Sequence, residues 1–192
     1  YKHLHKEEGK FQGISIVPFV VDLYSIIQYN KCKSLLDYGC GKAVGYTQNF
    51  KNIDPKKKIP NFNVPLHTYW GIEDLSLYDP GTLEYPTLPS KKADIVLCTD
   101  VLEHIPEEDL DWLIREICSL ANTTVFLNIS CQLAKKTFTT GKYKGENVHV
   151  SVFDHAWWVD KIKTIHKDYK ELKIYLTCTS KEGILGTCIK GD

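Results

Sequence analysis

Residues 35–41, Leu-Leu-Asp-Tyr-Gly-Cys-Gly, constrain the fold more than any other part of the chain. A short apolar run that ends in turn residues is typical of a buried parallel strand. Two glycines, Gly39 and Gly41, follow this run and would let the backbone turn sharply and approach a ligand closely. Asp37 adds a carboxylate at the same turn. The segment therefore predicts a parallel α/β sheet with a ligand-binding loop at the glycine pair.

The composition of the chain is that of an ordinary globular protein. Of its 192 residues, 43% are hydrophobic and 25% are charged, which fits one folded domain over residues 1–192. Lys plus Arg and Asp plus Glu both number 24, so no net charge attracts nucleic acid or an anionic membrane. Arg115 is the only arginine. Because arginine supplies the forked contact to guanine, sequence-specific DNA binding is not expected.

Hydropathy and cysteine usage bear on where the protein resides and on whether it binds a metal. No run of about 18 apolar residues occurs, so no membrane-spanning helix is expected. The seven cysteines are odd in number, no two have C-x-x-C spacing, and several lie in apolar runs. This pattern is typical of reduced, mostly buried thiols in a cytoplasmic protein, and it predicts no zinc or other metal site.

Apolar periodicity and turn residues divide the chain into alternating helices and strands. Helical spacing covers residues 14–29 and predicts an N-terminal helix there. Strands are expected at residues 34–38, 75–78, 94–98, 123–129, 172–178 and 184–189, and further helices after Pro106 and at residues 156–166. Residues 51–66 hold three prolines and are expected to form a loop or an interrupted helix. The alternation predicts a doubly wound, mostly parallel sheet, and the last two strands predict an antiparallel hairpin.

The second informative stretch is residues 98–106, Cys-Thr-Asp-Val-Leu-Glu-His-Ile-Pro, at the end of a predicted buried strand. In open α/β sheets, ligands bind outside the carboxyl ends of the strands. We therefore expect Asp100 and His104 to face the same crevice as the two glycines. A plainer interpretation also stays open, in which Glu103 and His104 only belong to the polar start of the following helix.

The glycine pair by itself allows a dinucleotide site, an S-adenosylmethionine site, or a tight turn without a ligand. A dinucleotide fingerprint, G-x-G-x-x-G, would need its third glycine where Val44 stands. It would also need an acid about 20 residues further on, where Ile59 follows three lysines. A simple turn requires neither two spaced glycines nor the preceding acid. These features disfavour a dinucleotide site and a turn without a ligand.

The two motifs together resemble those of the class I S-adenosylmethionine-dependent methyltransferases of small-molecule type. Residues 36–41 are similar to the start of this family's first motif, and residues 94–105 to its fourth-strand motif. The resemblance extends over residues 35–189, down to the final hairpin. It implies an α/β, Rossmann-like, doubly wound sheet of seven mostly parallel strands with a C-terminal antiparallel hairpin. It also implies S-adenosylmethionine as the cofactor, with Asp100 and Val101 among the residues that contact it.

The resemblance assigns the first motif to the cofactor. The backbone at Gly39, Cys40 and Gly41 would approach its methionine part. Asp37 would orient this loop and the ammonium group of the cofactor. The family often carries a third glycine at position 43, where this chain has Ala43.

An acid at the end of the second strand usually binds both ribose hydroxyls in this family, because one carboxylate can accept two hydrogen bonds. Asp79 is favoured for this role, with an insertion at residues 51–69 that separates it from the glycines. Glu73 or Asp74 would take the role if the strand were residues 67–72 instead.

The substrate side depends on residues 145–150, Gly-Glu-Asn-Val-His-Val, after the fifth strand of the family fold, where substrate residues are commonly placed. His149 could take a proton from a hydroxyl or an amine as the methyl group transfers. A histidine held in a structural turn is the alternative. Trp157 and Trp158 are expected in the core rather than in a wall of the substrate site, because aromatic side chains mostly serve packing.

The sequence thus predicts methyl transfer from S-adenosylmethionine to an oxygen or nitrogen atom of a small molecule or sugar. Such a transfer depends on alignment of the acceptor more than on acid chemistry. The alternatives are another S-adenosylmethionine user, such as a lyase or a nucleic-acid methyltransferase, and a non-catalytic nucleotide-binding regulator of the same fold. A dinucleotide oxidoreductase is disfavoured by Val44. The absence of N/D-P-P-Y/F after the fourth strand argues against methylation of DNA amino groups. The expected partner is a small-molecule acceptor, and no oligomeric state follows from the sequence.

Overall fold

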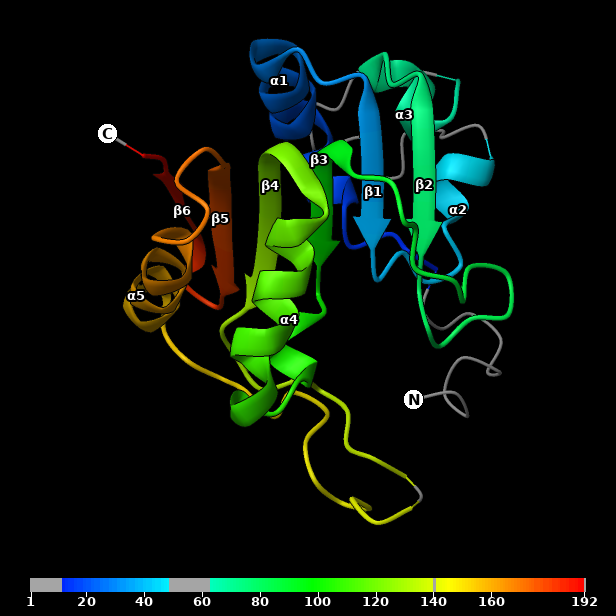
Figure 1. Ribbon diagram of the computed structural model, residues 1–192. Coiled ribbons are helices and arrows are strands. Elements are labelled where there is room, and N and C mark those ends of the chain that lie inside the picture. Colours follow the sequence, from blue (N-terminus) through cyan, green and yellow to red (C-terminus); the bar gives the residue numbers. More distant parts are fainter. Residues whose placement is uncertain (1–11, 49–62, 140, 192) are drawn as a thin grey trace. The chain divides into compact units, whose positions relative to one another are not determined.

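The computed structural model describes residues 12–48, 63–139 and 141–191 (Figure 1). Six strands within these ranges form one sheet in the order β2-β1-β3-β4-β5-β6. The strands are β1 (Ser34–Tyr38), β2 (Asp74–Tyr78), β3 (Ala93–Thr99), β4 (Ala121–Ser130), β5 (Lys173–Ser180) and β6 (Gly183–Ile189). β1 pairs in parallel with β2 and β3, β5 pairs in parallel with β4, and β6 is antiparallel to β5. The predicted α/β fold with a mostly parallel sheet and a C-terminal antiparallel hairpin is therefore confirmed.

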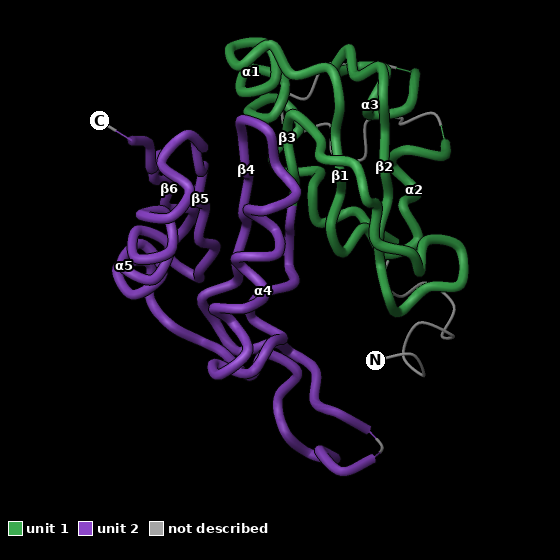
Figure 2. The backbone as a smooth tube through the Cα atoms, in the orientation of Figure 1, with its two compact units in different colours: residues 1–97 green, residues 98–192 purple. Residues whose placement is uncertain are grey.

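The chain forms two compact units, Tyr1–Leu97 and Cys98–Asp192 (Figure 2). The boundary between them falls within β3. The single domain expected over residues 1–192 stays a prediction.

The first unit contains the predicted N-terminal helix and two short helices after β1. Its helices are η2 (Val17–Phe19), α1 (Val20–Asn30), α2 (Val44–Thr47) and α3 (Leu66–Trp70). The helical spacing of residues 14–29 thus corresponds to η2 and α1. α3 packs on α1, where Trp70 is fully buried and its indole N–H donates to the Val20 carbonyl oxygen at 3.0 Å. Residues 51–62 of the expected loop or interrupted helix lie outside the described residues.

The second strand lies where it was predicted, and its position decides between the candidate acids. β2 begins at Asp74, and Asp79 follows its last residue directly. Residues 67–72, the alternative strand, form most of helix α3 and the turn that ends it, so that alternative is wrong. Glu73 precedes β2 and Asp74 opens it, so neither stands at the carboxyl end of the strand.

The second unit contains the two predicted helices that follow strands. Its helices are η3 (Leu102–His104), α4 (Glu107–Ser119) and α5 (His155–His166). α4 begins directly after Pro106, with three acids in its first turn that complement the positive end of the helix dipole. Its buried face carries Leu110, Leu113, Ile114 and Ile117. α5 is capped by Asp154, whose carboxylate accepts a hydrogen bond from the Trp157 N–H at 2.8 Å.

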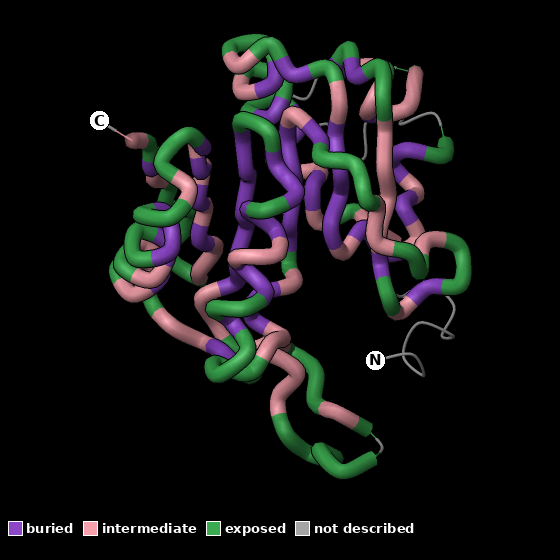
Figure 3. Tube along the Cα trace, viewed as in Figure 1, coloured by how far each residue is buried: buried purple, intermediate pink, exposed green. Residues whose placement is uncertain are grey.

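Burial along the strands separates the centre of the sheet from its last strand (Figure 3). β1 is buried at four of its five residues and β3 at six of its seven, whereas β6 is exposed at most positions. Trp158 is fully buried, as predicted. Trp157 is only half-buried and stacks on Phe153, with ring centroids 3.8 Å apart.

The cysteines fit the expected pattern of mostly buried thiols. None of the seven forms a disulfide, and only Cys131 and Cys188 are not buried. Among the described residues, no group of three or more side chains could hold a metal ion. In the same part of the chain, no helix is both long enough and apolar enough to cross a membrane.

Candidate functional site

The loop after β1 has the backbone conformation that the glycine pair predicted. Gly39 and Gly41 have φ angles of 86° and 57°, in the left-handed region that glycine adopts without a side-chain clash. The N–H groups of Gly39 and Cys40 donate to the Tyr78 carbonyl oxygen at 2.7 and 3.1 Å. This glycine loop, residues 39–43, is thus fastened to the last residue of β2, at the carboxyl ends of two neighbouring parallel strands.

Ala43 takes the conformation that a glycine would take at the same position. Its φ angle is 52°, and it lies fully buried at the N-terminal cap of α2. A left-handed conformation costs a residue other than glycine roughly 1–2 kcal/mol. The loop therefore has the backbone conformation that a glycine at position 43 would allow, and Ala43 is strained in it.

A segment before η2 supports the backbone of the glycine loop. The N–H of Val44 donates to the Gln12 carbonyl oxygen at 3.1 Å. Gly13 has a φ angle of 70°, and a Cβ atom there would lie 2.3 Å from the Cys40 carbonyl oxygen. Only glycine fits such a close approach. Sequence reasoning missed this support, because a lone glycine outside a periodic segment gives no signal.

Asp79 ties the glycine loop to the turn after β2. One oxygen of its carboxylate accepts from the Gly41 N–H at 2.9 Å, and the other accepts from the Gly81 N–H at 2.7 Å. The residue is 8% exposed. A carboxylate can accept several hydrogen bonds, so this group has the chemistry that binds hydroxyls. The sequence predicted Asp79 as a cofactor residue, but not its bond to the glycine loop.

Asp37 is the second buried acid of this cluster. It is 3% exposed, and its Oδ1 has no hydrogen-bond partner among the described residues. Burial raises the pKa of Asp37 to about 7, the neighbouring Tyr46 hydroxyl opposes this rise, and the charge of Asp79 adds to it. The Tyr46 hydroxyl is near Asp37 but lacks hydrogen-bond geometry to any described residue. Around neutral pH, Asp37 therefore exchanges between an acceptor-only carboxylate and a carboxyl that can donate.

Cys40 contributes its backbone to the loop rather than a reactive thiolate. Its side chain is buried, and the thiol donates to the Gly41 carbonyl oxygen at 3.6 Å. Burial raises the pKa of Cys40 well above its usual range, and the charges of Asp37 and Asp79 raise it further. The thiol is therefore neutral and unreactive at physiological pH.

In the second unit, Asp100 follows β3 in a strained conformation. Its φ angle of 54° is left-handed, which is uncommon for a residue other than glycine. The Asp100 N–H donates to the Asn128 carbonyl oxygen, and Asn128 Nδ2 donates to Asp100 Oδ1, both at 3.1 Å. Thr177 and Thr179 donate to Asn128 Oδ1 and so fix the orientation of the amide. Strain that a network enforces in this way is concentrated at functional sites.

Glu103 in η3 is fully buried and connects the loops of the second unit. Its Oε1 accepts from the Ser130 N–H at 2.9 Å, and its carbonyl oxygen accepts from Val150 and Ser151 at 2.8 and 3.0 Å. Oε2 has no partner among the described residues. Burial raises the pKa of Glu103 to about 8, and the charge of Asp100 adds to the rise. The interpretation of Glu103 as part of the polar start of a helix is wrong, since its side chain is buried and does not cap α4.

His104 and His149 lie far apart in the sequence but meet in the second unit. Their ring centroids are 4.8 Å apart, and the planes cross at 79°. His104 Nδ1 faces the Val148 carbonyl oxygen and His149 Nδ1 faces the Gln132 carbonyl oxygen, each at 2.7 Å. A carbonyl oxygen only accepts, so in both neutral rings Nδ1 carries the proton and Nε2 carries the lone pair. His104 therefore does more than begin the following helix.

Asn147 holds the polar segment that carries His149. Its Oδ1 accepts from the N–H groups of Ala134 and His149 at 3.0 and 2.9 Å, and its Nδ2 donates to the Ala134 carbonyl oxygen at 2.9 Å. One amide thus closes the segment on itself. We call the described residues of 131–154 the histidine segment. Sequence reasoning singled out His149 but missed the structural role of Asn147, because two of its three hydrogen bonds reach Ala134, 13 residues away.

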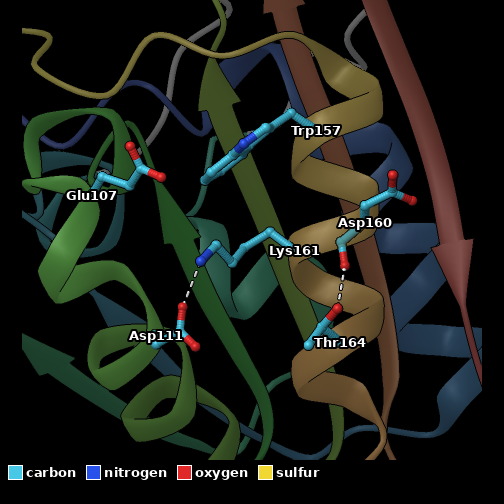
Figure 4. A pocket seen from close by; sticks show the side chains of 6 residues that line it. All are labelled: Glu107, Asp111, Trp157, Asp160, Lys161 and Thr164. Atoms are coloured by element: carbon cyan, nitrogen blue, oxygen red, sulfur yellow. Dashed lines mark hydrogen bonds and ion pairs between the residues drawn. The ribbon is translucent and has the colours of Figure 1, made fainter.

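A surface groove of about 310 Å³ lies between α4 and α5 (Figure 4). Its lining residues are Glu107, Asp111, Trp157, Asp160, Lys161 and Thr164. Lys161 Nζ lies 2.6 Å from Asp111 Oδ1 and 5.3 Å from the centroid of the Trp157 ring. The Thr164 hydroxyl donates to the Asp160 carbonyl oxygen at 2.9 Å. Because these groups largely satisfy one another, the groove offers a ligand less than the two buried clusters do.

The predicted cofactor residues fall into one cluster in each unit. Asp37, Gly39, Cys40, Gly41 and Asp79 form the first. Asp100 belongs to the second, and the half-buried Val101 follows it and accepts a hydrogen bond from the His104 N–H. No protein-family model, curated protein or solved structure matches the chain. The geometry of these clusters therefore carries the functional inference, and their contacts with a cofactor stay predictions.

Proposed function

We propose that this protein is a cytoplasmic class I S-adenosylmethionine-dependent methyltransferase that acts on an oxygen or nitrogen atom of a small molecule or sugar. The observation that carries the proposal is the 2.9 Å hydrogen bond from the Gly41 N–H to Asp79 Oδ2. Two residues 38 positions apart, which the resemblance assigns to the same cofactor, thus meet in one buried cluster.

The order of the strands supports a ligand at the glycine loop. In doubly wound sheets, ligands bind outside the carboxyl ends of the two neighbouring strands between which the winding direction reverses. Here the reversal falls at β1 and β3, since β2 flanks β1 on one side and β3 flanks it on the other. The glycine loop follows β1 at this point. The proposal includes a Rossmann-like sheet with a seventh strand, one more than the described residues contain.

The residues of the first cluster fit S-adenosylmethionine. Gly39 and Gly41 leave the loop backbone without side chains, so a ligand can approach it closely. Asp79 is a buried carboxylate directly after β2, and a carboxylate can accept hydrogen bonds from two hydroxyls. Asp37 has an oxygen without a partner among the described residues, which suits a hydrogen bond from the ammonium group of the cofactor.

When bound, S-adenosylmethionine supplies a methyl group on a positively charged sulfur. The chain must then align the acceptor atom and remove one proton from it. His149 suits the second task, because its Nε2 carries the lone pair and its ring is held through Nδ1. No metal enters this scheme, since proton removal and alignment are enough for transfer from a sulfonium.

Titration calorimetry tests the cofactor. We expect the protein to bind S-adenosylmethionine and its demethylated product, S-adenosylhomocysteine, and not NAD. Binding of NAD without binding of S-adenosylhomocysteine would contradict the proposal. Binding of S-adenosylhomocysteine without methyl transfer to any compound of a metabolite extract would instead favour the non-catalytic regulator.

A further inference from the structure

We propose that His104 and His149 form one proton-accepting unit, in which His104 positions His149, and that the methyl acceptor is a hydroxyl group. The second half of this inference rests on the proposed function. The first half stands on the geometry of the second unit alone.

The two imidazoles hold each other through a single peptide. His104 Nδ1 donates a hydrogen bond to the carbonyl oxygen of Val148, the residue directly before His149. His149 in turn stands edge-on to the His104 ring, and its own Nδ1 is held by Gln132. A shift of His104 would therefore move the backbone that carries His149. This coupling makes His104 a positioning residue rather than a second independent base.

The rest of the second unit fixes this arrangement from outside. Val150 and Ser151 donate to the carbonyl oxygen of Glu103, the neighbour of His104. The Ser151 hydroxyl donates to the Ile105 carbonyl oxygen at 2.6 Å. The histidine segment is thus bonded to the backbone on either side of His104. These hydrogen bonds fix the backbone next to both rings.

Burial and mutual repulsion make the pair take up its second proton less readily than its first. A second proton would place two positive charges about 5 Å apart, the distance between the ring centroids. Burial lowers the pKa of His104, the Val148 carbonyl opposes this effect, and His149 lowers the pKa further. Asp100, at the end of β3, acts in the opposite direction. Glu103 is turned toward Ser130 and is held mostly neutral at physiological pH.

A positioned base is needed more by a hydroxyl than by an amine. A neutral amine attacks with its own lone pair and can lose its proton afterwards, whereas a hydroxyl is a weak nucleophile until its proton leaves. In the proposed step, the hydroxyl oxygen forms a bond to the methyl carbon. The carbon–sulfur bond of the sulfonium breaks, and its electron pair stays on sulfur. The hydroxyl proton moves to Nε2 of His149.

NMR titration of the full chain with isotope-labelled histidine tests the pair without any ligand. The wild-type pair should take up its protons in two steps separated by more than about 1 pH unit, because two part-buried rings about 5 Å apart repel more strongly than two charges in water. His104→Phe keeps a ring against His149 but cannot carry charge, and His104→Asn keeps a donor for Val148 but removes the ring. The step that belongs to His104 should be missing in both variants. In His149→Asn, which removes the neighbouring charge, His104 should take up its proton at a higher pH than in the wild type. His155→Asn, on α5, is the matched control and should leave both steps unchanged.

Several outcomes would overturn the pair. One is independent titration of the two rings in the wild type, and another is an unchanged titration curve of His104 in His149→Asn. If His149→Asn fails to fold, His149→Phe offers the same test through His104. Loss of both titrations on addition of equimolar Zn²⁺ alone would replace the proton-accepting unit by a metal site.

Methyl-labelled S-adenosylmethionine tests the hydroxyl. The protein is incubated with a metabolite extract and ¹³C-methyl cofactor, and the chemical shift of the product methyl carbon separates oxygen-bound from nitrogen-bound methyl groups. An oxygen-bound methyl group supports the inference, and a nitrogen-bound one overturns its second half. If no methyl group is transferred, the proposed function fails together with the hydroxyl, while the titration still decides on the histidine pair.

Discussion

The glycine loop and the histidine segment are held in place by opposite means. In the glycine loop, backbone N–H groups donate to the Tyr78 carbonyl oxygen and the Asp79 carboxylate. The loop reaches these acceptors with left-handed φ angles at Gly39, Gly41 and Ala43. In the histidine segment, side chains of Asn147 and His149 bind backbone groups of the segment itself. The first region should therefore respond to changes of backbone freedom, and the second to changes of side-chain chemistry.

The largest effect is expected in the histidine segment. Once an acceptor is known, His149→Ala should lower turnover by roughly 10²–10⁴-fold, the usual contribution of a general base, and leave the affinity for S-adenosylhomocysteine unchanged. Steady-state kinetics and calorimetry measure the two quantities separately. Full turnover of the variant would show that His149 only holds a structural turn.

Gly39→Val should weaken binding of S-adenosylhomocysteine by roughly 100-fold or more. At a φ angle of 86°, a β-branched side chain is strained and stands where the ligand would approach. The matched control is Gly145→Val in the histidine segment, where φ is 89° but a new Cβ meets nothing within 4 Å. Calorimetry should find its affinity unchanged, with circular dichroism as a check of the fold. Equal losses in both variants would show that strain alone, and not the site, is responsible.

Asp79→Asn should weaken cofactor binding by about 1–3 kcal/mol, which corresponds to roughly 5–150-fold. The amide loses the charge and turns an N–H group toward either Gly41 or Gly81, both of which are donors. Asp74→Asn is the control, because Asp74 opens β2 and forms an exposed ion pair with Lys91. Its affinity should change less than twofold by calorimetry, and a larger loss there would contradict the ribose role of Asp79.

The two buried acids should give the protein a stability that falls as pH rises. Both pKa values are raised by folding, so the native state binds more protons than the unfolded state, and protonation stabilises it. The stability from Asp37 should be lost between about pH 4 and 7, and that from Glu103 between about pH 4.5 and 8. Urea denaturation at a series of pH values measures the free energy of unfolding. Its total change with pH should be smaller by roughly 2–4 kcal/mol in Asp37→Asn or Glu103→Gln. Between pH 7 and 8, only Glu103→Gln should flatten the curve, and a wild-type stability that rises with pH would contradict this account.

The smallest effect separates backbone strain from side-chain packing. Ala43→Gly should raise the free energy of unfolding by about 1 kcal/mol. The substitution removes the strain of an alanine in the left-handed region, and this gain exceeds the conformational entropy that glycine loses on folding. Ala93→Gly, at the start of β3, should lower it by about 0.5–1 kcal/mol. Urea denaturation measures both changes, and effects of the same sign would refute the strain at Ala43.

The elements could be predicted from sequence because each carries its own local pattern. The run at residues 94–98 became β3, and residues 75–78 became β2, within one or two residues. Asp79 could be named because it follows a strand, but its bond to Gly41 depends on the register in which Tyr38 pairs with Tyr78. That register is a property of the folded sheet.

Two features of the second unit, the burial of Glu103 and the approach of His104 to His149, could not be predicted from sequence for a related physical reason. Glu103 looks like a surface acid beside Leu102 and His104, and it is buried only because Ser130 and Ser151 come from distant parts of the chain. The approach of His104 to His149 likewise depends on the path of the histidine segment, which has no periodic pattern to predict it.

The hydrogen bond between Gly41 and Asp79 also has a consequence for the order of folding. Its two residues are 38 positions apart and stand at the ends of β1 and β2, so it can form only after these strands have paired. The β5–β6 hairpin, by contrast, closes over a turn of a few residues and pays little loop-closure entropy. We expect a refolding chain to acquire hairpin structure early and the ability to bind S-adenosylhomocysteine last.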